Sequence, residues 1–242
     1  MKITFHKRIV AYFGYEFTRL SNNIYKNQNS HILELIKRHN LNLVLDVGAN
    51  MGQFGLGLRN AGYDGEIISF EPIKECYEYL ISIADDNWHI HNYALGDTDS
   101  LQHINISKKS VFSSILETNN FGKTKFSESI GIVEKQSIQI KKLDAILPEL
   151  IKDIEDKNIF LKLDTQGYDI KVINGATKIL NFVYALQTEI SCKAIYEDTP
   201  PHYQVLKQLA ESGFNITGIF PLSHDDQSME LLEFDCVMTK TR

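Results

Sequence analysis

The sequence contains few cysteines and prolines and no long apolar run. Its 242 residues include five prolines and three cysteines, Cys76, Cys192 and Cys236. No two cysteines have the C-x-x-C spacing of a zinc site or a redox motif, so we expect free thiols in a reducing cytoplasm and no metal site. No apolar run approaches the roughly 18 residues of a membrane span. The N-terminus also lacks the apolar core and cleavage site of a signal peptide.

Basic residues are outnumbered by acidic ones. The chain has 25 Lys and Arg against 31 Asp and Glu, a net charge of −6, which argues against a general nucleic-acid-binding protein. The charge is uneven, because residues 1–42 hold seven Lys and Arg but only two Glu. This favours a solvated basic helical face over a docking segment for an anionic surface. A hydrophobic content of 43% is ordinary for a globular protein, and the length suits one large α/β domain.

Residues 1–42 are predicted to form a helical segment ahead of the main domain, residues 43–242. Apolar side chains recur near a helical period over residues 5–20, which predicts an amphipathic helix that packs on the main domain or on a partner subunit of a homo-oligomer. The alternative for this helix is docking on a membrane surface. A second helix is expected from Ser30 or His31 to Asn40.

From residue 43 the pattern alternates between strand and helix, as a parallel α/β architecture requires. The predicted strands are Val44–Val47, Glu66–Phe70, Trp88–Tyr93, Ile159–Leu163 and Val183–Glu189, followed by an antiparallel hairpin of Phe214–Phe220 and Leu232–Met238. The predicted helices are Gly52–Ala61, Ile73–Ala84, Ala145–Leu150 capped by Asp144, Asp169–Leu180 and Pro200–Ser212.

Residues 98–142 interrupt the alternation. Leu101–Ile106 and Ser137–Ile140 are predicted as short strands on either side of a polar segment, Ser107–Gln136. A long segment without periodicity inside a compact domain is typically disordered or functional. We predict an insert that acts as a lid or recognises the acceptor.

A glycine turn follows the first predicted strand, in the stretch from Leu43 to Gly52. The spacing is Asp-x-Gly-x-Asn-x-Gly, so the dinucleotide fingerprint Gly-x-Gly-x-x-Gly is absent. Such a turn before a helix brings backbone N–H groups close to a ligand. Asp46 would repel a pyrophosphate but would suit a cationic ligand such as S-adenosylmethionine.

Polar side chains also follow the next predicted strands. Glu71 comes directly after the second strand, where a carboxylate can accept hydrogen bonds from both hydroxyls of a ribose. Asn92 and Ala94 follow the third strand and could border an adenine. Asp164 ends the strand before the Gln166-Gly167 turn, and parallel strand ends meet at the ligand edge of a doubly wound sheet.

An ordered series of motifs carries a more specific signal. Eight short motifs follow one another in the chain: Leu45-Asp46-Val47-Gly48-Ala49-Asn50-Met51-Gly52, Phe70-Glu71-Pro72, Asn92-Tyr93-Ala94-Leu95-Gly96-Asp97, Ser113-Ser114, Leu143-Asp144, Leu161-Lys162-Leu163-Asp164-Thr165-Gln166-Gly167-Tyr168, Asn174-Gly175-Ala176 and Thr188-Glu189. Over residues 43–220 this series resembles the FkbM family of S-adenosylmethionine-dependent methyltransferases. The resemblance implies a Rossmann-like, mostly parallel seven-stranded sheet with helices on both faces and an antiparallel last strand.

The resemblance also implies roles for individual residues. Residues of the glycine turn would hold the methionine part of the cofactor: Asp46, Gly48, Ala49, Asn50, Gly52 and Gln53. Glu71 would bind the ribose, Asn92 and Ala94 would lie by the adenine, and Asp164 and Gln166 would sit near the sulfonium and the acceptor. Gln166 stands where many members have Glu.

The reaction implied is in-line transfer of a methyl group, most often to a hydroxyl, and we expect a glycan or related small molecule as acceptor. A base would take the proton of a hydroxyl, and the candidates are Asp164 and Glu189, ahead of His202 and His224. A divalent metal between Asp164 and Glu189 is the less favoured interpretation. Rival hypotheses are N-methylation of a peptide or amide side chain, a nicotinamide-dependent oxidoreductase, and a cofactor-binding module without activity.

Overall fold

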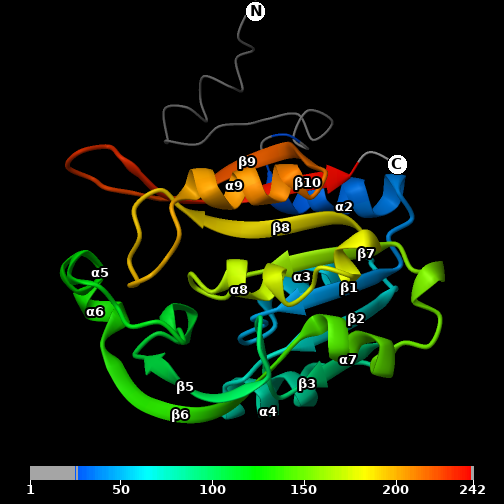
Figure 1. The fold of residues 1–242 in the computed structure, drawn as a ribbon, viewed down its shortest axis with the longest axis horizontal. Coiled ribbons are helices and arrows are strands. Elements are labelled where there is room, and N and C mark those ends of the chain that lie inside the picture. Colours follow the sequence, from blue (N-terminus) through cyan, green and yellow to red (C-terminus); the bar gives the residue numbers. More distant parts are fainter. Residues whose placement is uncertain (1–24, 26, 241–242) are drawn as a thin grey trace, which may run out of the picture.

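The computed structural model describes residue 25 and residues 27–240 (Figure 1). The helix predicted for residues 5–20 lies outside the described residues. The strands are β1 Leu43–Val47, β2 Glu66–Phe70, β3 Trp88–His91, β4 Ala94–Leu95, β5 Ser100–Ser107, β6 Ile132–Lys141, β7 Ile159–Leu163, β8 Val183–Ser191, β9 Phe214–His224 and β10 Leu231–Lys240. The α-helices are α2 Gln28–Arg38, α3 Gln53–Asn60, α4 Lys74–Ile83, α5 Asn120–Lys125, α6 Ser127–Ile130, α7 Leu143–Leu150, α8 Asp169–Asn174 and α9 His202–Glu211. Among the described residues, no helix is long and apolar enough to cross a bilayer.

A seven-stranded sheet forms the centre of the molecule, in the order β3-β2-β1-β7-β8-β10-β9. The strands from β3 to β8 pair in parallel, and β10 runs antiparallel to both β8 and β9. The mostly parallel sheet with an antiparallel last strand is therefore confirmed. Every residue of β1 and β7 is buried, as the apolar sequences of these strands predict. The strand order reverses between β1 and β7, and ligands of doubly wound sheets bind beside such a switch point.

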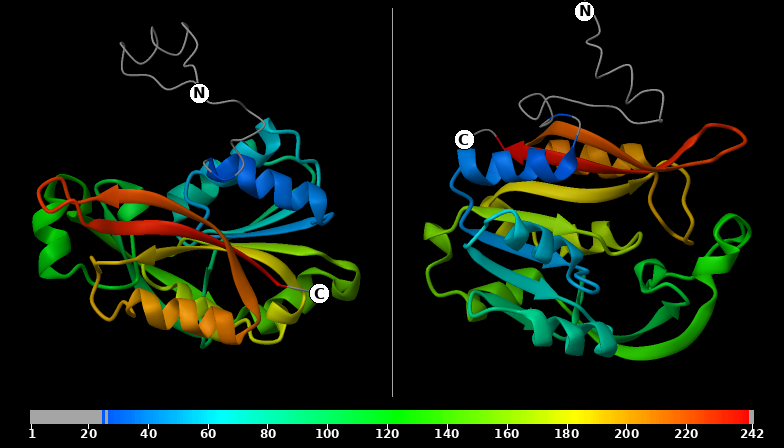
Figure 2. Two further views of the ribbon diagram at one scale, coloured as in Figure 1. Left: turned by 90° about the horizontal axis from the view of Figure 1, so that it is seen from above. Right: turned by 180° about the vertical axis from the view of Figure 1, so that it is seen from behind.

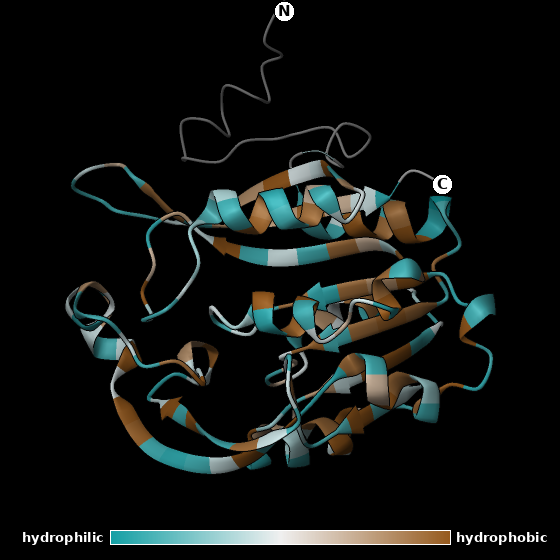
Figure 3. Cartoon of the chain, viewed as in Figure 1, coloured by the Kyte–Doolittle hydropathy of each residue, from teal (hydrophilic) through white to brown (hydrophobic). Residues whose placement is uncertain are grey.

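Helices cover both faces of this sheet. Figure 2 shows α2 and α9 on opposite sides of it. Leu35, Leu58 and Leu80 from α2, α3 and α4 pack on one face, against β1, β7 and β8. Side chains of α7, α8 and α9 pack on the other face in a larger core. The central strands are predominantly hydrophobic, consistent with burial on both sides (Figure 3).

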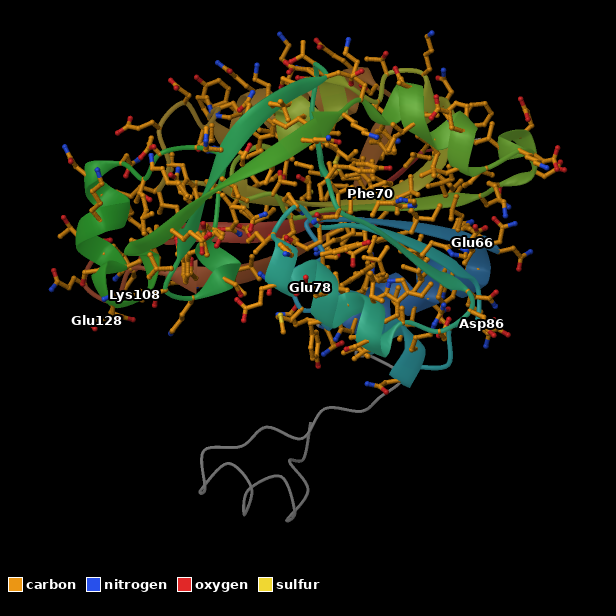
Figure 4. The ribbon with its side chains drawn as sticks, turned by 90° about the horizontal axis from the view of Figure 1, so that it is seen from below. Glu66, Phe70, Glu78, Asp86, Lys108 and Glu128 are labelled. Carbon is orange, nitrogen blue, oxygen red and sulfur yellow. The ribbon has the colours of Figure 1, made fainter. Side chains whose placement is uncertain are left out.

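The predicted insert forms a second, three-stranded sheet in the order β4-β6-β5. β5 and β6 are longer than the two short strands that the sequence predicts, and they pair antiparallel from Ser100–Ile140 to Ser107–Ile132. The outer half of β6 is largely exposed, and its polar residues interrupt the apolar pattern from which a strand would be predicted. Figure 4 shows this ribbon from below, with Lys108 and Glu128 at its outer end, far from Glu66 and Asp86. A turn of 3₁₀ helix, η2 (Ser110–Phe112), brings the chain back toward the main sheet.

Two local predictions are wrong. The helix predicted over Asp169–Leu180 ends at Asn174. The next residue, Gly175, packs directly on the backbone of Gly96. A Cβ at position 175 would come within 1.9 Å of the Gly96 carbonyl oxygen. The chain then forms a separate 3₁₀ turn, η4 (Ile179–Asn181). Asp144 does not cap its own helix either. Its carboxylate accepts hydrogen bonds at 2.9 Å from the backbone N–H groups of Lys178 and Ile179, and so caps η4.

Candidate functional site

A cavity of about 420 Å³ lies at the carboxyl ends of the parallel strands. This volume is within the usual range of small-molecule sites. The glycine turn after β1, the ends of β2, β7 and β8, and the start of β10 form its walls. The insert closes the remaining side with Ile104 and residues 110–115. Of the twelve site residues that the sequence predicts, nine line this cavity: Gly48, Ala49, Asn50, Gln53, Glu71, Ala94, Asp164, Gln166 and Glu189.

The glycine turn depends on a left-handed backbone and a close approach between strands. Gly48 has φ +74°, and a Cβ there would lie 2.0 Å from the backbone oxygen of Asp164. Asn50 also has a positive φ, and its side-chain oxygen accepts hydrogen bonds from Met51 N at 2.8 Å and Ser110 Oγ at 3.1 Å. The turn is thus held between the end of β7 and the insert, with its backbone at the cavity.

Glu71 is a buried carboxylate at the cavity wall, only 3% exposed. Its oxygens accept hydrogen bonds from Asn50 N at 2.7 Å and from Ile73 N at 2.8 Å. Burial raises the pKa of Glu71 to about 7, although these two hydrogen bonds favour the charged form. Each oxygen keeps a further lone pair with which to accept a ligand hydroxyl.

Asp46, Gly52 and Asn92 are the three predicted residues that do not line the cavity. Gly52 (φ +78°) begins α3, packed against Leu80 and Trp88. The Asn92 amide donates to the backbone oxygens of Glu71 and Pro72, at 2.9 and 3.1 Å, and so holds the turn after β2. These two residues shape the site from behind its wall.

Asp46 is fully buried and paired with Lys162, which sequence reasoning did not single out. Lys162 Nζ lies 3.0 Å from Asp46 Oδ1 and 3.5 Å from Asp164 Oδ2, and it donates to the backbone oxygen of Gly48 at 2.8 Å. Burial lowers the pKa of Lys162, but the charges of Asp46 and Asp164 outweigh it and the pKa is raised. A lysine alone in the apolar strand Ile159–Leu163 was the available sequence signal. Lys162 neutralises Asp46, so this carboxylate does not present a bare charge to the cavity.

Asp164, Gln166 and Glu189 are brought together beside the cavity. The Gln166 amide nitrogen lies 3.1 Å from Asp164 Oδ1 and 3.3 Å from Glu189 Oε2. Its oxygen lies 3.0 Å from the hydroxyl of Tyr196, and its backbone oxygen accepts from Ser114 Oγ at 2.8 Å. Gln166 has φ +53°, so these contacts hold it in a backbone conformation unusual for a residue other than glycine.

Two further polar residues line the same end of the cavity, Gln187 from β8 and Glu233 from β10. Glu233 is 8% exposed and accepts a hydrogen bond from Ser223 Oγ at 3.1 Å. Burial and the negative charges of Asp164 and Glu233 raise the pKa of Glu189 well above its usual value. Acidic residues inside the apolar strand Leu232–Met238 were the sequence signal for Glu233.

Among the described residues, no cluster of three or more His, Cys, Asp and Glu side chains could hold a metal ion. The candidate bases His202 and His224 are not among the cavity-lining residues. The cavity therefore combines a backbone turn, a buried carboxylate suited to hydroxyl groups, and a separate acidic end.

Comparison with known proteins adds the family. A family model described as a methyltransferase FkbM domain matches residues 46–216. The fold is similar to that of magnesium protoporphyrin IX methyltransferase from Synechocystis PCC 6803 with bound SAM, at 11% identity and a TM-score of 0.47, covering 88% of this chain and 77% of that one. It is also similar to a SAM-dependent methyltransferase from Aquifex aeolicus, at 11% identity and a TM-score of 0.42, covering 98% and 100%. No curated protein matches the sequence significantly.

Proposed function

The chain belongs to the FkbM methyltransferase family and is an S-adenosylmethionine-dependent methyltransferase, and we propose that it methylates a hydroxyl group of a sugar-like acceptor by in-line transfer. The observation that carries the hydroxyl assignment is Glu189, a carboxylate with a raised pKa at the acidic end of the cavity. A hydroxyl loses its proton as the new bond forms, and burial that raises the pKa of the Glu189 carboxyl makes its carboxylate a stronger base for that step.

The cofactor fits the half of the cavity around the glycine turn. Gly48, Ala49, Asn50 and Gln53 line this part of the cavity and would hold the methionine part of the cofactor. The absence of a Cβ at Gly48 lets the turn pack against the Asp164 carbonyl. Glu71 would accept the two ribose hydroxyls with the lone pairs that Asn50 N and Ile73 N leave free. Ala94 and its apolar neighbours Leu95 and Ile73 would flank the adenine. Asp46, Gly52 and Asn92 do not line the cavity, and they would act by fixing the turns after β1 and β2.

When bound, the cofactor supplies a methyl group already activated on a sulfonium. The remaining work of the chain is to position the acceptor and to accept a proton. Asp164 would lie near the positive sulfonium, and Gln166 would orient Asp164 and Glu189 through its amide nitrogen. Holding the acceptor in line can lower the barrier by roughly 7–11 kcal/mol. Glu189 would take up the acceptor proton.

The insert, residues 98–142, would recognise the acceptor or close over it. Residues 110–115 line the cavity, and Ser114 joins the insert to the Gln166 turn through a hydrogen bond.

All three cysteines are free thiols, which supports a reducing cytoplasmic location. The basic segment 1–42 would serve assembly, substrate docking or contact with a membrane surface.

The test is methyl transfer from labelled S-adenosylmethionine to a panel of glycans, lipid-linked sugars and peptides, read by mass spectrometry. We expect a one-methyl mass gain on a carbohydrate oxygen. Methylation of a peptide nitrogen would replace the hydroxyl assignment with the N-methyltransferase alternative. Tight S-adenosylhomocysteine binding without transfer to any acceptor would favour a silent module. NAD binding without S-adenosylhomocysteine binding would favour the oxidoreductase.

A further inference from the structure

One face of the β8–β10 pair carries four polar side chains at the acidic end of the cavity. Glu189 lies opposite Asp235 in the antiparallel register, and Gln187 and Glu233 are each two residues away on the same face of their strands. Gln187, Glu189 and Glu233 line the cavity. Diagonal neighbours in such a pair lie about 7–8 Å apart, so Glu189 and Glu233 border adjoining parts of the cavity.

Glu189 and Glu233 receive hydrogen bonds from neutral groups. Ser223 Oγ donates to Glu233 at 3.1 Å, and the Gln166 amide nitrogen lies 3.3 Å from Glu189 Oε2. In the described part of the chain, neither carboxylate has a Lys, Arg or His nitrogen within 4.0 Å. A buried carboxylate is costly to keep charged without a cationic partner. Their surroundings therefore lack a positive charge that a ligand can supply.

The cofactor accounts for only part of the negative charge around the cavity. The carboxylates that line it are Glu71, Asp164, Glu189 and Glu233. The one basic side chain that lines it in the described part of the chain, Lys162, is balanced by buried Asp46 at 3.0 Å. S-adenosylmethionine carries a single net positive charge, and the proposed arrangement places its ribose at Glu71 and its sulfonium near Asp164. The carboxylates of Glu189 and Glu233 are left for the acceptor.

Gln187 adds a hydrogen-bond acceptor to the same row of side chains. It is 5% exposed, and its side-chain oxygen has no hydrogen-bond partner among the described residues. A buried polar atom without a partner is costly, so this oxygen indicates a ligand that donates a hydrogen bond to it. The row as a whole suits a ligand with several donors and a positive charge. A protonated amine beside hydroxyl groups meets both requirements.

We propose that Glu233 binds a protonated amine of the acceptor and thereby places a neighbouring hydroxyl beside Glu189. The acceptor class is then a hydroxylated compound with a free amine, such as an amino sugar, with a further donor at the Gln187 oxygen. This inference rests on the proposed function and narrows its acceptor. An ammonium group has no lone pair, so the methyl group goes to the hydroxyl oxygen. Glu233 is thus a specificity-determining residue, and Glu189 remains the base.

The binding experiment uses the full chain saturated with S-adenosylhomocysteine and a panel of methyl glycosides. Each amino glycoside of the panel carries one amine at a different ring position. Each is matched with its N-acetylated form, which keeps the ring but has no charge. Calorimetry at neutral pH gives the affinities. We expect at least one amino glycoside to bind about tenfold or more tightly than its acetylated form, as a charged hydrogen bond predicts.

Three variants separate charge from other effects. Glu233→Gln is expected to remove the preference for the amine. Glu230→Gln replaces an exposed glutamate next to β10 that is paired with Lys193, and it should keep the preference. Gln187→Met should weaken charged and acetylated glycosides alike, by about fivefold, because it removes a hydrogen-bond acceptor without changing the charge.

Methyl transfer from labelled S-adenosylmethionine to the same panel identifies the atom that is methylated. We expect a methyl ether on an amino glycoside whose amine is unmodified. Three results would overturn the proposal: no binding of any amino glycoside, equal binding of each amine and its acetylated form, or a preference that survives Glu233→Gln. Methylation of the amine itself would also overturn it, since the nitrogen must then be bound without its proton.

Binding of S-adenosylhomocysteine by each variant separates this inference from the function on which it rests. Glu233→Gln and Glu230→Gln should bind it equally. Weaker binding in Glu233→Gln alone would assign this carboxylate to the amino group of the cofactor, and would overturn the inference while leaving the methyltransferase function in place. A wild-type protein that does not bind S-adenosylhomocysteine would instead count against the proposed function itself.

Discussion

At the scale of single residues, the pairing of Asp46 with Lys162 changes how the first motif is understood. The sequence suggests that Asp46 selects a cationic cofactor by its own charge. In the structure this carboxylate is fully buried and lies 3.0 Å from Lys162 Nζ, which also donates to the Gly48 oxygen. The acid therefore fixes the lysine, and the lysine joins the glycine turn to the end of β7.

Replacing Lys162 by Met tests this role. The change leaves Asp46 buried without its counter-ion, and breaking a buried pair in this way costs roughly 3–5 kcal/mol. We expect a corresponding loss in the free energy of unfolding, measured by urea denaturation, together with weaker S-adenosylhomocysteine binding. The double variant Asp46→Asn/Lys162→Met should recover most of the stability, since it removes the unpaired charge. Equal destabilisation of the single and double variants would contradict the pairing.

At the scale of elements, the β1–α3 turn and the insert are the two parts that make the cavity. The turn requires glycine at Gly48, because φ is +74° and the Asp164 carbonyl leaves no room for a Cβ. Gly57, in the middle of α3, has open space around it in the described part of the chain. Position 48 therefore requires glycine, whereas position 57 has room for a side chain.

We predict that Gly48→Ala destabilises the protein severely or prevents folding, because both the conformation and the contact forbid it. Gly57→Ala should instead stabilise by about 0.5–1 kcal/mol, the helix propensity difference between the two residues. Thermal denaturation followed by circular dichroism compares the variants directly. A Gly48→Ala protein with wild-type melting temperature would be inconsistent with the turn described here.

The insert is joined to the β7–α8 turn through Tyr196. Its hydroxyl lies 2.9 Å from the Phe112 backbone oxygen and 3.0 Å from the Gln166 side-chain oxygen. Tyr196→Phe removes these contacts, and a lost hydrogen bond costs about 1 kcal/mol. We expect faster amide hydrogen exchange in residues 110–116, read by mass spectrometry. The control Tyr203→Phe alters a tyrosine that is 61% exposed on α9 and should leave exchange in the insert unchanged.

At the scale of the whole molecule, the sequence predicts the parallel strands and the polar residues at their ends, but it does not predict the acidic end of the cavity. Apolar runs such as Ile159–Leu163 define buried strands, and residues just after them must reach one edge of the sheet. Glu233 enters the cavity because β10 runs antiparallel and brings its first residues to that same edge. This pairing joins segments more than forty residues apart, from Glu189 to Asp235, so local periodicity carries no information about it. The break at Gly175 likewise depends on a contact with distant Gly96.

The buried acids together determine how stability depends on pH. Burial raises the pKa of Glu71 to about 7 and that of Asp235 to about 6, and it also raises the pKa of Asp169, Glu189 and Glu233. In the unfolded chain glutamate titrates at about 4.3 and aspartate at about 3.9. Between those values and the raised ones the folded chain holds more protons, so the free energy of unfolding falls as pH rises.

We therefore expect the cofactor-free protein to be more stable at about pH 5.5 than at pH 8, with a melting temperature that decreases between them. Glu71→Gln should flatten part of this decrease, because its amide does not titrate, whereas the exposed Glu75→Gln should not. Ribose hydroxyls donate to the charged form of Glu71, so cofactor affinity should change in the opposite direction and rise with pH through about 7. Differential scanning calorimetry with and without S-adenosylhomocysteine measures both trends. A melting temperature that rises steadily from pH 5.5 to 8 without ligand would show that these carboxyl groups are not buried as described.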